Sequence, residues 1–154
     1  MNHAHGAAQT DVTRLALDAT RHCLTGCAIG EVVGLVISGA LGLTTEASIV
    51  AGIVLAFVFG YSFTFVPLLR AGMALGRALG ITLAADTISI VVMETVDNLI
   101  VLLVPGAMAA GLDDPLFWGS LALGLVIAFA AAFPVNRWLI ARGRGHALAH
   151  PRHG

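Results

Sequence analysis

The chain has 154 residues, of which 58% are hydrophobic and only 11% are charged, and its mean hydropathy is +0.91. Soluble domains are on average roughly one quarter charged, so this composition excludes an ordinary soluble domain and indicates an integral membrane protein. A formal net charge of -1 argues against nucleic-acid binding. The length suits a single domain, and two cysteines are too few for a disulfide framework.

The two ends of the chain are polar. Residues 1–21 are predicted to form a flexible N-terminal tail, and they hold no apolar stretch that could act as the h-region of a cleaved signal peptide. Residues 142–154, which contain His and Arg, are predicted to form a second flexible tail. Residues 22–141 between them form the predicted transmembrane domain.

Four apolar segments are long enough to cross a hydrocarbon core roughly 30 Å thick, which requires about twenty residues in a helix. They are residues 22–43, 47–69, 83–104 and 116–140. We therefore predict an all-α fold, an integral membrane bundle of four antiparallel helices built as two hairpins. The lipid bilayer is its first expected partner.

The basic residues predict the orientation of this bundle. The loops at residues 44–46 and 105–115 carry Glu46, Asp113 and Asp114 and no basic residue. All eight basic residues are arginines in the tails, in the loop at residues 70–82, or at adjoining helix ends: Arg14, Arg21, Arg70, Arg77, Arg137, Arg142, Arg144 and Arg152. The positive-inside rule therefore places both termini in the cytoplasm.

Small residues recur at every fourth position in three of the predicted helices. These stripes are Gly26, Gly30, Gly34, Ser38 and Gly42, then Gly52, Ala56, Gly60 and Thr64, then Ser120, Gly124, Ala128 and Ala132. Such stripes let helix backbones approach closely within a membrane. They predict tight packing inside the bundle, and the same stripes could also mediate a homo-oligomer.

A polar stripe runs along the first predicted helix. Residues four apart share a helix face, so Cys23, Cys27 and Glu31 lie in line beside the glycines, and His22 lies at the cytoplasmic edge of this line. Because the stripe borders the expected helix contact, we predict that it faces protein and not lipid.

The third predicted helix carries a matching set of polar residues. Asp86, Met93 and Asp97 fall on one narrow face, with Glu94 at its margin. At about 1.5 Å per residue, Glu31 and Glu94 each lie roughly 14 to 17 Å from the cytoplasmic start of their helix. Their carboxyl groups are therefore expected to meet near the membrane centre, provided that the first and third helices are neighbours.

The buried acids carry the main argument for function. An acidic residue at the centre of a membrane helix costs on the order of 2.5 to 3.5 kcal/mol, and such residues usually mark ion pathways, proton relays or binding sites. No intramembrane arginine or lysine is available to pair with Glu31, Glu94 or Asp97. Protons or bound cations are then the available counter-charges, and hydrogen-bonded acids with a purely structural role are the alternative.

Taken together, the polar residues predict a transition-metal site. Thiol and thioether ligands favour soft ions such as Cu(I), imidazole suits zinc, copper or iron, and carboxylates favour harder ions. The predicted metal ligands are His22, Cys23, Cys27, Glu31, Met93, Glu94 and Asp97. We expect binding and transmembrane passage of copper first and zinc or iron next, with the carboxylates exchanging protons for the ion.

Three other functions are compatible with the sequence. An oligomeric proton or cation channel would use the carboxylates as a selectivity ring. A membrane thiol oxidoreductase would use Cys23 and Cys27, although their spacing differs from the redox C-x-x-C motif and both approach the reducing cytoplasmic side. A structural partner subunit would leave the buried acids unexplained. No nucleotide-binding or hydrolase motif is present, which favours a role other than an enzyme.

Two segments also resemble a known family. Residues 19–31, ATRHCLTGCAIGE, and residues 93–98, METVDN, are similar to the bacterial membrane-protein family of unknown function DUF4396. The resemblance extends over nearly the whole chain after the N-terminal tail. It implies only a bacterial multi-helix membrane protein and supplies no activity, so the function must be inferred from the residues. The expected location is the bacterial inner membrane, which the chain would cross several times.

Overall fold

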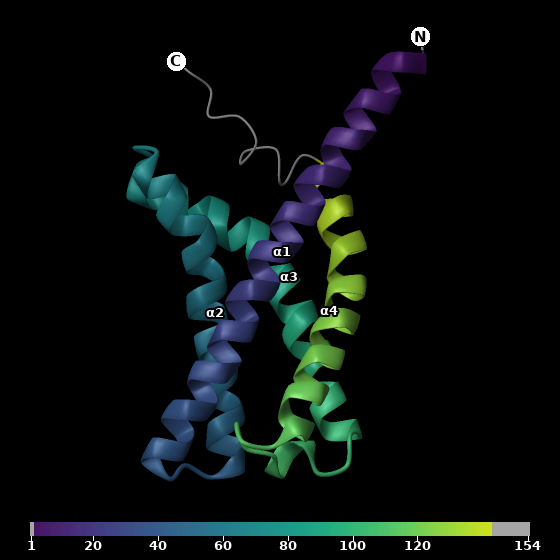
Figure 1. Cartoon of the computed structure of the whole chain (residues 1–154). Helices are drawn as coiled ribbons and strands as arrows, with labels where there is room; N and C mark the ends of the chain where they lie inside the picture. The colour runs from purple at the N-terminus through teal and green to yellow at the C-terminus, as the bar shows by residue number, and fades with distance from the viewer. Residues whose placement is uncertain (1, 143–154) are drawn as a thin grey trace.

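The structure is a computed structural model that describes residues 2–142, with side chains from residue 11 onward. Four long helices form one bundle, and no strand occurs between residues 2 and 142 (Figure 1). The helices are α1 (Asn2–Leu41), α2 (Thr45–Arg70), α3 (Leu75–Leu103) and α4 (Pro115–Ala141), with a short 3-10 helix η1 (Ala107–Ala109) before α4. The predicted all-α four-helix fold is confirmed.

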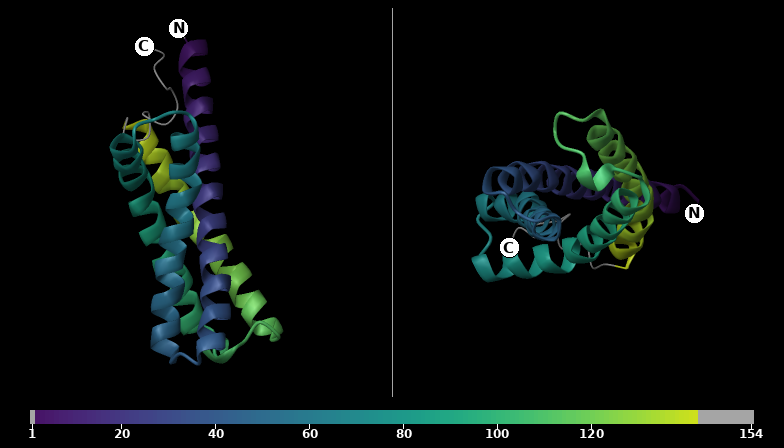
Figure 2. Two further views of the ribbon diagram at one scale, coloured as in Figure 1. Left: turned by 90° about the vertical axis from the view of Figure 1, so that its left-hand side faces the viewer. Right: turned by 90° about the horizontal axis from the view of Figure 1, so that it is seen from below.

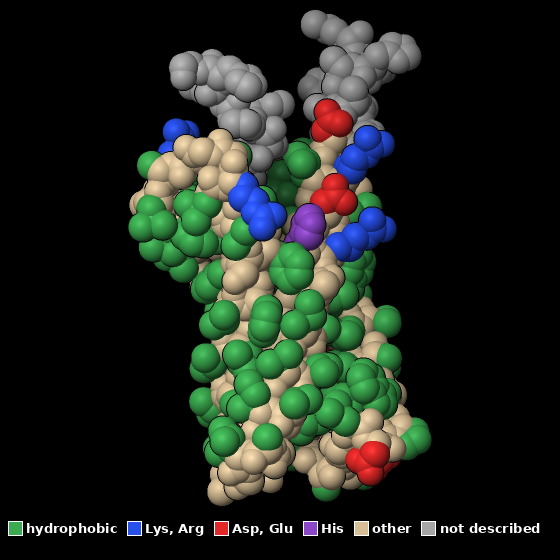
Figure 3. All heavy atoms as spheres, turned by 60° about the vertical axis from the view of Figure 1, so that its left-hand side comes forward, with side chains coloured by type: hydrophobic (Ala, Val, Ile, Leu, Met, Phe, Trp, Pro, Cys, Tyr) green, Lys and Arg blue, Asp and Glu red, His purple; other side chains and the backbone are tan. Residues whose placement is uncertain are grey.

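All four helices are long and apolar enough to cross a membrane. Even α2, with 26 residues, is roughly 39 Å long at about 1.5 Å per residue, which exceeds a hydrocarbon core of roughly 30 Å. Large apolar side chains are exposed on all four helices; Val50 and Val126, for example, are 59% and 68% exposed. We call these side chains the apolar belt, and Figure 3 shows apolar side chains spread over one face of the bundle. This belt is the surface expected of a protein that lies in lipid.

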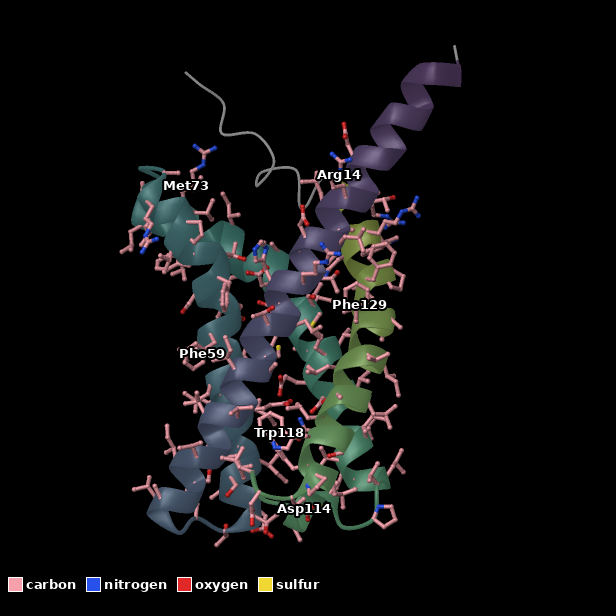
Figure 4. All side chains as sticks on the ribbon, viewed as in Figure 1. Arg14, Phe59, Met73, Asp114, Trp118 and Phe129 are labelled. Atoms are coloured by element: carbon pink, nitrogen blue, oxygen red, sulfur yellow. The ribbon has the colours of Figure 1, made fainter. Side chains whose placement is uncertain are left out.

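The two ends of the bundle differ in charge. The start of α1, the turn between α2 and α3, and the end of α4 lie together at the end where arginine side chains gather in Figure 3. We call this the arginine end, and Figure 4 marks it with Arg14 and Met73. The turn between α1 and α2 and helix η1 lie at the opposite end, which we call the η1 end and which Figure 4 marks with Asp114.

Local sequence signals define the helix ends. Gly42 and Gly72 adopt φ values of +64° and +82°, which suit glycine, and each directly follows a helix or its cap. The N–H of the next residue then donates back to the helix, from Leu43 to the carbonyl of Ser38 at 3.0 Å in the first case. Asp114 caps the start of α4, where its Oδ1 accepts from the Leu116 N–H at 2.8 Å.

The most extensive packing joins α1 and α2, which lie side by side in both views of Figure 2. A Cβ atom added at Gly26 would lie 2.6 Å from the Cα of Gly60, and one added at Gly34 would lie 2.7 Å from the Cα of Gly52. Gly30 faces the backbone of Ala56 in the same way. The predicted small-residue stripes therefore form a backbone-to-backbone contact inside one chain.

Residues 2–21, in the predicted N-terminal tail, belong to helix α1. Helix α1 is continuous from Asn2, and within this segment Ala16 and Thr20 are fully buried. Arg137 donates from Nε to the Thr13 hydroxyl at 3.3 Å, so α1 and α4 also interact near the arginine end. Burial of these small residues against the bundle extends the helix beyond its apolar span.

The loop predicted for residues 70–82 is also shorter in the structure. Helix α3 begins at Leu75, and Ala78 and Thr82 in its first turns are buried, which explains why this polar-looking segment is helical. Of the predicted C-terminal tail, only Arg142 is described, and it follows the end of α4 directly. Residues 143–154 lie outside the described part of the chain.

Candidate intramembrane cation site

Three acidic side chains line one pocket inside the bundle. Glu31 comes from α1, and Glu94 and Asp97 come from α3, which packs directly against α1. The pocket has a volume of about 210 Å³ and extends to Thr45 and Ala107 at the η1 end. Since one water occupies about 30 Å³ of liquid, this acid pocket has room for an ion with several waters. The acids therefore face the end opposite the arginines.

The three acids of the pocket are close to one another. The carboxyl groups of Glu31 and Asp97 lie within hydrogen-bonding reach, and Glu94 is near enough to interact electrostatically with both. Glu94 and Asp97 are each 5% exposed. Both carboxyl oxygens of Glu94 and Oδ1 of Asp97 are buried without a hydrogen-bond partner in the described structure. The pocket thus holds polar oxygens whose bonding capacity is unused.

No basic group neutralises these acids among the described side chains. The charged neighbours of Glu31 are Asp97 and Glu94, and the polar neighbours of Glu94 are Asp97 and Cys27. Neighbouring carboxylates repel each other, and the repulsion is strong where water is scarce. Bound protons or a bound cation must therefore offset most of the negative charge.

Small residues on the neighbouring helices make space for the acids. The carboxyl group of Asp97 lies against Gly124 of α4, where any side chain would collide with it. On the other side, the backbone of Glu31 packs close to Gly52 of α2. The predicted small-residue stripes of α2 and α4 therefore do more than bring helices together, because they also frame the pocket.

The sulfur-bearing residues lie in a different environment. Cys23, Cys27 and Met93 are 4%, 2% and 1% exposed and belong to a packed apolar cluster. We call this cluster the core plug; its residues are Cys23, Cys27, Ala56, Ile90, Met93, Ala128 and Ala132. Both thiols are free, and none of the three sulfur residues lines the acid pocket. Cys27 is the one thiol next to the pocket, since it interacts electrostatically with Glu94.

His22 lies apart from the other predicted ligands. It is exposed on α1, on the arginine side of the core plug, and its ring stacks near that of Phe63 with centroids 6.4 Å apart. Its charged neighbour is Asp86 of α3, which also lies within hydrogen-bonding reach of Thr64. The seven predicted ligands therefore fall into an outer acid pocket, a central sulfur-containing plug and a separate histidine. Within residues 11–142, no group of three or more His, Cys, Asp and Glu side chains is placed to hold a metal ion.

A second polar group lies between three helices and was not predicted as a unit. The Asn136 side chain of α4 donates from Nδ2 to the Thr20 hydroxyl of α1 at 2.8 Å and to the Ser89 hydroxyl of α3 at 3.0 Å. Thr20 in turn donates to the carbonyl of Ala16 at 2.7 Å. An asparagine in an apolar span was the available sequence signal, but its partners depend on how the helices are arranged.

The comparison with protein families agrees with this architecture. A family model described as a domain of unknown function, DUF4396, matches residues 14–145. The chain belongs to the DUF4396 family. The DUF4396 match includes the acid pocket, the core plug and the junction at Asn136, so all three are features of the family domain in this chain. No curated protein and no solved structure is significantly similar to it.

Proposed function

We propose that this protein binds a cation in the acid pocket and passes it across the membrane in exchange for protons. One observation carries the proposal: Glu31, Glu94 and Asp97 line a single pocket, and no described basic side chain lies beside them. Carboxyl groups in this arrangement need protons or a cation as counter-charge, and the two compete for the same oxygens. Binding the cation therefore releases protons, and protonation releases the cation.

The core plug determines the side of the membrane from which a cation can enter the acid pocket. The pocket reaches the η1 end, whereas the packed side chains of Cys27, Ile90 and Met93 separate it from the arginine end. A cation in the pocket is thus accessible from one side of the membrane, the side at the η1 end. Passage to the other side requires α3 to move relative to α1, so that Glu94 and Asp97 face past the plug.

A transition-metal ion is our first choice of cargo, with copper first and zinc or iron next. Cys27 lies next to Glu94, so one sulfur ligand borders the acid pocket, and Met93 lies with Cys27 in the core plug. Soft ions prefer such ligands, and carboxylates add charge. A movement that opens the plug would expose the sulfur atoms to the ion at the same time.

A proton or hard-cation channel is the second candidate, and the present geometry gives it a specific argument. The sulfur atoms pack in the apolar plug, and the described residues contain no preassembled metal-binding group. In this case the carboxyl groups alone select the ion, several copies of the chain assemble around the path, and the thiols serve only for packing.

Equilibrium binding to the purified, untagged protein tests the proposal. Dialysis against Cu(I), Zn(II), Fe(II) and Mn(II), followed by elemental mass spectrometry, measures the bound ion in wild type, Glu94→Gln, Asp97→Asn and Cys27→Ala. Glu46→Gln is the matched control, because Glu46 is an exposed acid at the start of α2. Saturable binding that both carboxyl variants lose and Glu46→Gln retains supports the acid pocket.

The same measurements separate the two candidates. Loss of binding in Cys27→Ala together with the carboxyl variants supports a transition metal held by sulfur and oxygen. If wild type binds none of these ions, proton and sodium flux into liposomes becomes the relevant test, and carboxyl-dependent flux supports the channel. Absence of both binding and flux contradicts the proposed function.

A further inference from the structure

Glu94 also faces a second opening, which adjoins the acid pocket. A groove of about 420 Å³ runs between α2 and α3. It shares one wall with the acid pocket, formed by Ile49, Ile53, Glu94, Asn98, Val101 and Met108. The other walls are mostly apolar and include Phe57 of α2 and Val91 of α3. Val91 is 49% exposed and Leu102 is 60% exposed, so the groove opens on the outer surface of the bundle.

The position of the groove between α2 and α3 along the bundle determines which molecules can enter it. Glu94 lies nine residues before the end of α3 at Leu103, roughly 14 Å from that end at about 1.5 Å per residue, and the exposed residues around the opening belong to the apolar belt. In a bilayer, the side of the groove at Val91 and Leu102 therefore opens toward lipid chains. Molecules that reach Glu94 by this route must first dissolve in the membrane.

Glu94 supplies the recognition chemistry. Its side chain is 5% exposed, and its carboxyl oxygens make no hydrogen bond in the described structure, with the Cys27 thiol as the nearest polar group. Asn98 donates to the backbone carbonyl of Glu94 at 2.8 Å, which leaves the carboxyl group itself available. No basic residue lines the groove. The walls thus complement an apolar body, and the single acid complements one positive charge.

We propose that the groove between α2 and α3 binds a membrane-soluble organic cation, with its charge at Glu94 and its apolar groups against α2 and α3. A phospholipid headgroup fits less well, because its phosphate would find no basic partner on these walls. This inference rests on the proposed function only in that both use the Glu94 carboxylate. It names a second class of cation, organic and apolar, that reaches this acid from the bilayer.

Tetraphenylphosphonium is a suitable probe, because it has a permanent charge, an apolar body and no hydrogen-bonding group. Equilibrium dialysis of the labelled compound against the protein in detergent, with empty micelles subtracted, measures its binding. Glu94→Gln removes the charge and keeps the shape, and we expect binding to weaken roughly tenfold or more, as for other buried charges that lose a partner. Val91→Trp, which fills the groove from the lipid side, should weaken binding to a similar extent.

Two control variants test the location. Val126→Trp adds the same bulk to an exposed residue of α4 outside both openings, and tetraphenylphosphonium binding should stay unchanged. Asp97→Asn alters the acid pocket but not the groove, so it should reduce metal binding far more than binding of the organic cation. Gel filtration and circular dichroism of each variant establish that it is folded.

The outcomes distinguish this inference from the proposed function. Absence of saturable tetraphenylphosphonium binding to wild type, with metal binding intact, overturns the inference alone. Equal binding by wild type and Val91→Trp overturns the lateral groove as the site. If Val91→Trp loses the organic cation and still binds metal, the groove and the acid pocket are separate sites that share Glu94.

Discussion

The carboxyl group of Asp97 on α3 lies directly against Gly124 on α4, in the space that any larger residue at position 124 would need. Oδ1 of Asp97 is buried there without a hydrogen-bond partner. The glycine therefore helps to form the acid pocket, although it has no side chain of its own. Because Gly124 has no side chain, the Asp97 carboxyl group of α3 fits between the helices.

Gly124→Ala should weaken cation binding, because the added methyl group displaces the Asp97 carboxyl. Overpacking of a well-packed site typically costs about 1 to 3 kcal/mol, and about 1.4 kcal/mol corresponds to a tenfold change in affinity. Equilibrium dialysis with the metal that wild type binds measures the effect. Gly119→Ala is the matched control on the same helix, since nothing lies within 4 Å of its added Cβ. Equal affinity in Gly124→Ala and Gly119→Ala would contradict the role of Gly124.

Gly30→Ala should destabilise the bundle by separating α1 from α2. A Cβ at this position would collide with backbone atoms of Ala56, which cannot rotate away as a side chain can. We expect a loss of about 1 to 3 kcal/mol in the free energy of unfolding. Unfolding in mixed micelles measures it, and Gly39→Ala, where the added Cβ meets nothing within 4 Å, serves as the control. A stability equal to that of Gly39→Ala would be inconsistent with the close backbone contact.

Asn136→Leu should loosen the junction of α1, α3 and α4. The change removes the hydrogen bonds to Thr20 and Ser89. Hydrogen bonds between membrane helices contribute on average about 0.6 kcal/mol each, so we expect a loss of roughly 1 kcal/mol in the free energy of unfolding. Thr95→Ala, which removes an exposed hydroxyl bonded only within α3, should change it much less. The idea fails if Asn136→Leu unfolds at the same denaturant concentration as Thr95→Ala.

Cation binding should weaken as the pH falls. Protons and the cation compete for the oxygens of Glu31, Glu94 and Asp97, so lowering the pH favours the protonated, cation-free pocket. In the range where the free pocket holds its protons, affinity should fall about tenfold per pH unit for each proton displaced. Titration of the metal at several pH values measures the slope. Asp97→Asn should show a shallower slope, and a slope of zero in wild type would exclude proton exchange.

The arginine end should face the cytoplasm. Single cysteines at Met73 and at Asp114, in a protein that also carries Cys23→Ala and Cys27→Ala, mark the two ends of the bundle. A membrane-impermeant maleimide added to intact spheroplasts should label Met73→Cys only after lysis, and Asp114→Cys before it. The reverse pattern would show that the positive-inside rule gives the wrong orientation for this chain.

The helices and their closest contact could be predicted from local sequence. Twenty-residue apolar segments leave few alternatives to membrane helices, because the bilayer offers no other partners for backbone groups. The spacing of Gly26, Gly30 and Gly34 also indicated close packing, which the contact with α2 confirms. The predicted third helix starts at residue 83, whereas α3 starts at Leu75. The segment from Leu75 to Thr82 is helical because it packs against the bundle, which hydropathy does not indicate.

The candidate site could be predicted only in part. Helical spacing indicates that Cys23, Cys27 and Glu31 share a face, but it does not tell which of them meet a cavity. In the structure Glu31 lines the pocket, and the two thiols pack in the core plug. Whether a residue of α1 lines the pocket or packs in the core plug depends on which residues of α2, α3 and α4 lie opposite it. A single sequence does not contain that arrangement of helices.

The close contact of α1 and α2 constrains how the protein can move. Where backbone touches backbone at Gly26 and Gly34, there are no side-chain rotamers to exchange, so the two helices can shift only by parting altogether. They should therefore move as one rigid body. The packing of α2 on α3 is less extensive, and Glu94 and Asp97 belong to α3. Any opening past the core plug then amounts to a rocking of α3 and α4 against a fixed pair of helices, and the glycines of α1 determine which half of the bundle stays still.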